Sequence, residues 1–182
     1  MVTWLFTYGF LFSILLRYLG VMSEFSVREA GAEDVDLILA FITELARYEK
    51  AEDQVVATSE DICNSLFSDN ARAHALICHD GALPIGYAVY FYNYSTWLGR
   101  NGMYIEDLYI TPGQRNTGAG TFMLQHLARL AVQQGCGRLE WSVLDWNEPA
   151  ISFYRKVGAR PQPEWIIYRL AGNELQAFAS QS

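Results

Sequence analysis

Apolar residues recur every three or four positions in two long stretches of the chain, which is typical of amphipathic helices. The first begins after Gly31, which with Asp34 forms a capping pair, and ends near Tyr48 and Glu49. The second follows Gly120 and ends at the glycine after Gln134. Two shorter helices are predicted. One is capped by Thr58 with Asp61, and the other by Asn147 with Pro149 in its first turn.

Between these helices lie segments rich in β-branched and aromatic residues, as strands are. Turn-forming residues separate them, such as the hairpin-type sequence at 79–82. The predicted strands are 25–30, 73–78, 83–94, 104–110, 138–144 and 165–170. The resulting order, β-α-α-β-β-β-α-β-α-β, predicts an α/β fold with a mixed sheet flanked by helices.

The first 16 residues carry no charge and are strongly apolar. A membrane-spanning helix requires about 20 apolar residues. The stretch also has neither the basic start nor the small-residue cleavage site of a secretory signal. Met22 is followed at once by domain-like sequence. We therefore expect an N-terminal extension at 1–21, from a start assigned too far upstream or as an appendage, and one folded domain at 22–182. A membrane anchor is the alternative.

Composition narrows the classes of partner. The 182 residues suit one domain. The net charge of -7 argues against a nucleic-acid partner and suits a cationic small substrate, although acidic chains are common in general. Three cysteines without a C-x-x-C pair indicate free thiols in a reducing compartment, which favours the cytoplasm. Three isolated histidines lack metal-ligand spacing, so no metal is expected.

The stretch from Met103 to Leu130 combines a strand, a turn, the glycine-rich sequence R-x-x-G-x-G and a helix. A helix that opens out of such a loop offers unpaired N–H groups and a positive dipole end, which suit a phosphate or pyrophosphate. The Walker loop is excluded because no Lys-Ser/Thr follows, and Met123 stands where the dinucleotide fingerprint needs its third glycine. An ordinary loop with two glycines is the alternative interpretation.

The loop resembles the acyl-CoA pyrophosphate loop of the GNAT superfamily of N-acetyltransferases. The resemblance is closest to the spermidine/spermine (diamine) N-acetyltransferase branch. It is carried by ELARYE at 44–49, YIEDLYI at 104–110 and WNEPAISFY at 146–154, and it spans nearly everything after Met22. It implies the GNAT fold, with a mixed, mostly antiparallel central sheet, and acetyl-CoA as cosubstrate.

The resemblance also implies where acetyl-CoA binds. The backbone of 108–110 would pair with the pantetheine arm, the loop and helix start would hold the pyrophosphate, and the cap of the later short helix would contribute as well. The expected cofactor-binding residues are Leu108, Tyr109, Ile110, Arg115, Asn116, Thr117, Gly118, Ala119, Gly120, Thr121, Asn147, Pro149 and Ala150.

Catalytic roles follow from the same resemblance. Tyr154 would protonate the leaving sulfur, and Glu106 would attract the amine and take its proton through water. Tyr48, Glu49 and Asp107 would join Glu106 in contacting the amine. Asp107 is adjacent to Glu106 on a strand, so the two side chains are expected on opposite faces. A homodimer is implied too.

One departure leaves the substrate open. The segment at 161–164 is shorter and less acidic than in the diamine enzymes, so a lysine-like amine such as thialysine fits as well as a polyamine. Two alternatives to a small-molecule enzyme remain. One is a non-catalytic acyl-CoA-binding regulatory module, which would need neither Tyr154 nor Glu106. The other is a protein N-acetyltransferase.

Overall fold

The computed structural model describes residues 23–181, so the expected extension at 1–21 lies outside the described residues. The chain divides into two compact units, one that ends at Ser142 and one that begins at Val143, and each is described by itself. Within the described residues, no helix is both long and apolar enough to cross a bilayer.

The N-terminal unit is built on a five-stranded sheet in the order β1-β2-β3-β4-β5. Neighbouring strands are antiparallel except β4 and β5, which are parallel. This confirms the expected mixed, mostly antiparallel sheet. The predicted strand at 138–144 is shorter than expected, because only its first part pairs with β4. The strands are β1 Phe25–Glu29, β2 Ala73–Asp80, β3 Leu83–Ser95, β4 Arg100–Ile110 and β5 Leu139–Trp141.

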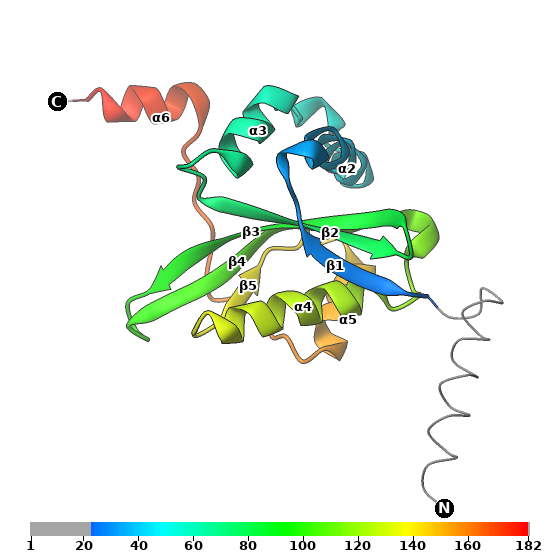
Figure 1. The fold of residues 1–182 in the computed structure, drawn as a ribbon. Coiled ribbons are helices and arrows are strands. Elements are labelled where there is room, and N and C mark those ends of the chain that lie inside the picture. Colours follow the sequence, from blue (N-terminus) through cyan, green and yellow to red (C-terminus); the bar gives the residue numbers. More distant parts are fainter. Residues whose placement is uncertain (1–22, 182) are drawn as a thin grey trace, which may run out of the picture. The chain divides into compact units, whose positions relative to one another are not determined.

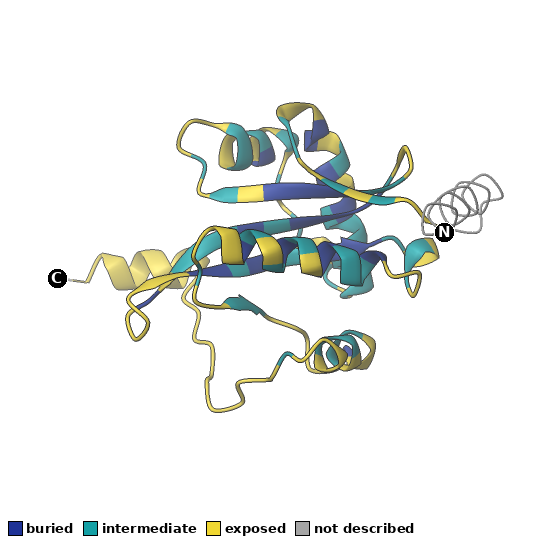
Figure 2. Cartoon of the chain, turned by 60° about the horizontal axis from the view of Figure 1, so that its bottom comes forward, coloured by how far each residue is buried: buried dark blue, intermediate teal, exposed yellow. Residues whose placement is uncertain are grey.

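Helices cover both faces of this sheet (Figure 1). Helices α2, Val35–Tyr48, and α3, Ser59–Phe67, lie on one face, and α4, Ala119–Gln133, lies on the other. Burial is concentrated along the central strands and the helix sides that face them (Figure 2). The core between the sheet and α2 and α3 consists of Val35, Ile38, Phe41, Ile62, Ala75, Ile77, Tyr87 and Tyr109. Three 3₁₀ turns complete the unit: η1 Ala32–Asp34, η2 Glu52–Gln54 and η3 Pro112–Gln114.

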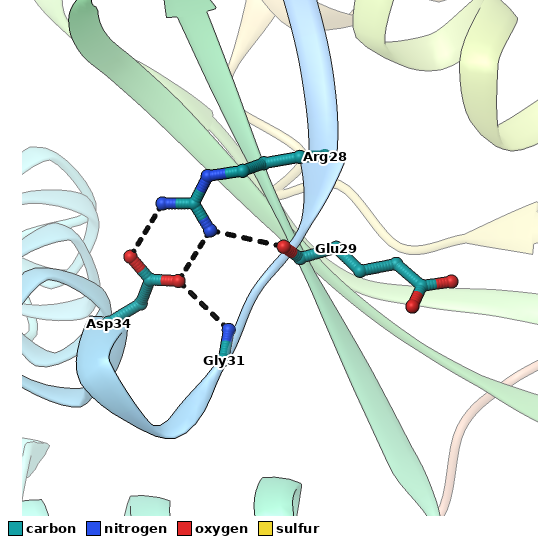
Figure 3. A network of polar contacts seen from close by, with 4 residues as sticks. All are labelled: Arg28, Glu29, Gly31 and Asp34. Atoms are coloured by element: carbon teal, nitrogen blue, oxygen red, sulfur yellow. Dashed lines mark hydrogen bonds and ion pairs between the residues drawn. The ribbon is translucent and has the colours of Figure 1, made fainter.

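An ion pair fixes the chain between β1 and α2 (Figure 3). Both terminal nitrogens of Arg28 donate to the carboxylate of Asp34, at 2.6 and 2.7 Å, and the backbone N–H of Gly31 donates to the same carboxylate at 2.9 Å. The expected capping pair of Gly31 with Asp34 is thus confirmed. It caps the η1 turn, and α2 begins directly after that turn, at Val35. The Arg28 guanidinium lowers the pKa of Asp34, against the opposing effect of burial.

The C-terminal unit contains α5, Glu148–Lys156, and α6, Gly172–Ala179. The prediction of a last strand at 165–170 is wrong, because these residues form no strand and are exposed. A strand needs a neighbour for its backbone hydrogen bonds, and the described part of the unit, 143–181, contains none. The residue types at 165–170 could not reveal that no neighbouring strand is present.

Candidate functional site

The glycine-rich loop joins the end of β4 to α4. Thr117 Oγ1 donates to the carbonyl of Gln114 at 2.7 Å and closes the first part of the loop. Asn116 and Gly118 then have φ angles of +64° and +105°. A positive φ is costly for most residues and free for glycine, so Gly118 permits the sharp turn into the helix that it caps.

The start of α4 offers backbone donors to an anion. The N–H of Phe122 donates to the carbonyl of Gly118 at 2.9 Å, so the N–H groups of Ala119, Gly120 and Thr121 come before the intrahelical ladder. The first turn contains no acidic residue to compete for this positive dipole end. The residues present therefore fit a phosphate or pyrophosphate, as the sequence suggested.

Strand β4 contains a bulge at its middle. Val89 is paired with Asp107 and the next residue of β3, Tyr90, with Ile105, so Glu106 is the extra residue. Beyond the bulge, Thr111 N–H donates to Ile85 of β3 at 2.8 Å. Backbone groups alternate along a strand, so those of Leu108 and Ile110 point away from β3.

The edge to which Leu108 and Ile110 point is not filled by β5. The parallel pairing of β4 with β5 covers only 103–105 with 139–141. The second half of β4 thus presents backbone donors and acceptors in strand geometry, and one of these acceptors, the carbonyl of Ile110, receives a 3.0 Å bond from Arg115 Nε. Such an edge can pair with an extended ligand that carries amide groups.

Two carboxylates lie close together where α2 ends beside β4. Asp107 is largely buried and accepts a 2.7 Å bond from Tyr87 Oη. Burial raises its pKa, and the Tyr87 bond opposes that rise. Burial also raises the pKa of Glu49, and the nearby charge of Asp107 raises it further. Burial of both carboxylates, and the effect of the Asp107 charge on Glu49, favour a cation beside them.

The bulge residue Glu106 has different surroundings. Its side chain is exposed, whereas Asp107, Glu49 and the hydroxyl of Tyr87 form one cluster. Of the four residues expected to contact the amine, Glu49 and Asp107 lie within electrostatic reach of each other, and Tyr48 adjoins Glu49 at the end of α2. Glu106 is exposed at the bulge, next to Asp107 in the chain.

The C-terminal unit supplies the remaining expected residues. Asn147 is buried, and its side-chain oxygen accepts a 3.3 Å bond from the N–H of Ala150. The expected cap of α5, with Pro149 in the first turn, is thus confirmed. Tyr154 lies on α5, partly buried, with its ring 5.3 Å from that of Phe153.

Two contributors to the site were missed by sequence reasoning. Tyr87 holds Asp107, and Glu44 accepts a 2.9 Å bond from Tyr109 Oη. Glu44 carried a signal, because it precedes Tyr48 by four residues and so shares its helix face. Tyr87 carried none, since only the register of β3 against β4 brings it near Asp107. Among the described residues, no cluster of His, Cys, Asp and Glu could hold a metal ion.

Comparison with known proteins decides the family. Residues 38–159 match the model of the acetyltransferase (GNAT) family. The chain belongs to the GNAT acetyltransferase family. Its acyltransferase fold and its glycine-rich loop are those that the sequence indicated.

Relatives of known name and structure are similar over most of the chain. The thialysine N-epsilon-acetyltransferase of Sus scrofa is 35% identical, over 88% of this chain and 100% of that enzyme. The human spermidine/spermine N(1)-acetyltransferase-like protein 1 is 32% identical, over 87% of this chain but 24% of that protein. A solved integron cassette protein from the mobile metagenome of V. cholerae is 28% identical, covers 86% of this chain and 98% of its own, and gives a TM-score of 0.72.

Proposed function

We propose that this GNAT enzyme transfers the acetyl group of acetyl-CoA to the primary amine of a small cationic substrate. The observation that carries the proposal is the cluster of Asp107, on the strand that leads to the glycine-rich loop, with Glu49, at the end of α2. A carboxylate pair attracts an ammonium group, and the loop and the open edge of β4 suit the phosphates and amides of an acyl-CoA.

Each element has a task in this proposal. Acetyl-CoA, when bound, supplies the activated acetyl group. The N–H groups from Asn116 to Thr121 bind its pyrophosphate, and the backbone of Leu108 to Ile110 orients its pantetheine arm. Asn147, Pro149 and Ala150 shape the start of α5, and Tyr154 on that helix donates the proton that the leaving thiol requires.

The amine needs both attraction and deprotonation. An alkylammonium has a pKa near 10.4, so about one molecule in a few thousand is a free amine at pH 7. Asp107, Glu49 and Tyr48 hold the cation, and Glu106 takes its proton through water. The exposed position of Glu106 at the bulge supports a water-mediated route, because bulk water reaches the carboxylate.

We further propose a lysine-like amine in preference to a polyamine. Two observations support this choice. The segment at 161–164 is short and carries a single acid, Glu164, and the thialysine enzyme of Sus scrofa aligns along its full length. We also propose a homodimer in the cytoplasm without nucleic-acid partners, on the grounds of the family resemblance, the unpaired cysteines and the net charge of -7.

Release of CoA thiol, measured with a panel of amines, tests the proposal. Thialysine, lysine, ornithine, spermidine and a peptide with a free N-terminus should be compared at equal concentration. We expect the fastest release with thialysine or lysine. Release with the peptide alone would instead identify a protein N-acetyltransferase. Tight acetyl-CoA binding without release for any amine would identify a regulatory module.

A further inference from the structure

The side chain of Arg115 contacts three residues on two elements of the N-terminal unit, β4 and α2. Its Nε donates to the carbonyl of Ile110, at the end of β4, at 3.0 Å. Its guanidinium carbon lies 4.4 Å from the ring centre of Tyr48 and 5.5 Å from that of Tyr109. Tyr48 is the last residue of α2, so one side chain at the start of the glycine-rich loop reaches the helix on the acceptor side.

Tyr109 is held from the same helix. Its hydroxyl donates to Glu44 at 2.9 Å, and burial together with this contact raises the pKa of Tyr109 to about 12. The phenol therefore stays protonated and keeps donating at neutral pH. Glu44, Tyr48, Tyr109 and Arg115 form a closed set of contacts between α2, β4 and the loop, which we name the Arg115 bracket.

The chemistry of these contacts is specific for arginine. A guanidinium is planar and stacks on aromatic faces while it still donates hydrogen bonds, whereas a lysine ammonium is a point charge on a flexible stem. The position also suits a cation, because the C-terminal end of α2 is the negative end of its dipole. Because Arg115 bonds the end of β4 and stacks on Tyr48, its side chain can orient the loop as well as add positive charge beside it.

We propose that Arg115 is a positioning residue, through which Tyr48 on the acceptor side sets the affinity of the glycine-rich loop for acetyl-CoA. This inference rests on the proposed function. The stacking of Arg115 on Tyr48 fixes the point where the loop leaves β4, and so the direction in which the N–H groups before α4 point. Tyr48 thereby contributes to acetyl-CoA binding even when no amine is present.

Binding of CoA to the full chain without any amine is the test, measured by isothermal titration. Tyr48→Leu removes the ring and should weaken CoA binding about three- to tenfold, the range of an exposed to partly buried cation–π contact. Tyr48→Phe keeps the ring and should bind CoA like the wild type. Tyr94→Leu, at an exposed tyrosine near the far end of β3, is the matched control and should change nothing.

A double-mutant cycle ties the effect to Arg115. Arg115→Lys keeps the charge and should weaken CoA binding as well. Tyr48→Leu combined with Arg115→Lys should then be no weaker than Arg115→Lys alone, because both changes remove the same contact. Arg129→Lys, at an exposed position of α4 away from the loop, is the matched control for an arginine-to-lysine change and should bind CoA like the wild type. Melting temperatures exclude a general loss of folding, and Tyr48→Met replaces Tyr48→Leu if that variant does not fold.

The outcomes separate this inference from the proposed function. If the wild type binds CoA and Tyr48→Leu binds it with the same affinity, the inference is overturned and the proposed function stands. Additive effects in the double mutant would overturn it too, because Tyr48 would then act independently of Arg115. A wild-type chain that does not bind CoA at all would overturn the proposed function and this inference with it.

Discussion

Two adjacent carboxylates on β4 have different surroundings, and this should divide their roles. Asp107 is largely buried, is bonded to Tyr87 and lies within the electrostatic reach of Glu49. Glu106 is exposed at the bulge. A buried carboxylate whose pKa is raised suits the binding of a cation, whereas an exposed one exchanges protons readily with water. The next two predictions separate these roles by changing one carboxylate at a time.

Glu106→Gln should lower kcat/KM for the amine at pH 7 by about 10²–10⁴-fold, the usual contribution of a general base. The loss should shrink as the pH rises toward 10, since more of the substrate then arrives already neutral. Steady-state kinetics between pH 6 and 10 measure both effects. A Glu106→Gln variant with wild-type rates over that range would show that the proton leaves by another route.

Asp107→Asn should lower amine affinity but raise the stability of the fold. Burial raises the pKa of Asp107 in the folded protein, so folding is penalised once the pH exceeds the unfolded value near 3.9. The variant should therefore melt higher than the wild type at pH 7 to 8, by about 2–4 °C for each 1 kcal/mol gained. The difference should fall toward zero at pH 4.

Thermal unfolding at several pH values checks this sign. Asparagine can still accept the bond from Tyr87, so the variant changes the charge and little else. Asp69→Asn, at an exposed position between α3 and β2, is the control and should show no such pH-dependent gain. A lower melting temperature for Asp107→Asn at pH 8 would contradict the prediction.

Tyr154→Phe should lower kcat by about 10²–10⁴-fold with little effect on CoA affinity, because only the proton donor is lost. The partly buried ring and its contact with Phe153 remain. Single-turnover rates and CoA titration distinguish chemistry from binding. An unchanged kcat would assign the proton to another group.

At the scale of elements, the ion pair of Arg28 with Asp34 joins β1 to the helix that carries Tyr48 and Glu49. Arg28 lowers the pKa of Asp34, so its contribution to stability is present above the unfolded value and is lost as the pH falls through the folded one. Asp34→Asn should cost about 1.5–3 kcal/mol at pH 7, as for hydrogen bonds to charged groups. The cost should be smaller at pH 3, below the unfolded value near 3.9.

Urea unfolding at both pH values measures this cost, with Asp69→Asn again as the control. Only the midpoint should move, while the slope of unfolding against urea stays the same. An Asp34 variant as stable as the wild type at pH 7 would mean that the apolar core alone holds α2 in place.

Elements that satisfy their own backbone could be predicted from sequence. The 3.6-residue periodicity and the caps at Thr58 and Asn147 located α3 and α5 correctly. Strands depend on distant partners, and so the segment at 165–170 was wrongly predicted. The bulge at Glu106 could not be predicted either, because it is defined only by the register of β3 against β4.

At the scale of the whole molecule, the site depends on contacts that no local pattern encodes. Motif resemblance indicated Tyr48, Glu49, Glu106 and Asp107 as a group, and in the fold the charge of Asp107 acts on Glu49. The resemblance did not indicate that Tyr87 bonds Asp107 or that Arg115 stacks on Tyr48, since these side chains are far apart in sequence. Long-range packing, and not residue type, decides such contacts.

A chain that starts at Met22 should be soluble, folded and as active as the full chain. The described elements begin with β1 at Phe25, and the full length of the Sus scrofa enzyme aligns within 88% of this chain. Circular dichroism, CoA release and fractionation of both chains test this expectation. Recovery of the full chain alone in membranes would favour the anchor, and loss of folding would give 1–21 a structural role.

The open half of β4 has a consequence for how this strand can vary. On the proposed function, Leu108 and Ile110 recognise the cosubstrate through main-chain groups that every residue except proline can supply in full. Selection for cosubstrate binding therefore places little demand on the identity of these side chains. The first half of β4, paired on both sides, is constrained as sheet. In the second half, Asp107 and Tyr109 keep the side-chain roles described above, so the freedom to vary is confined to Leu108 and Ile110, within the limits that packing sets on the buried Ile110.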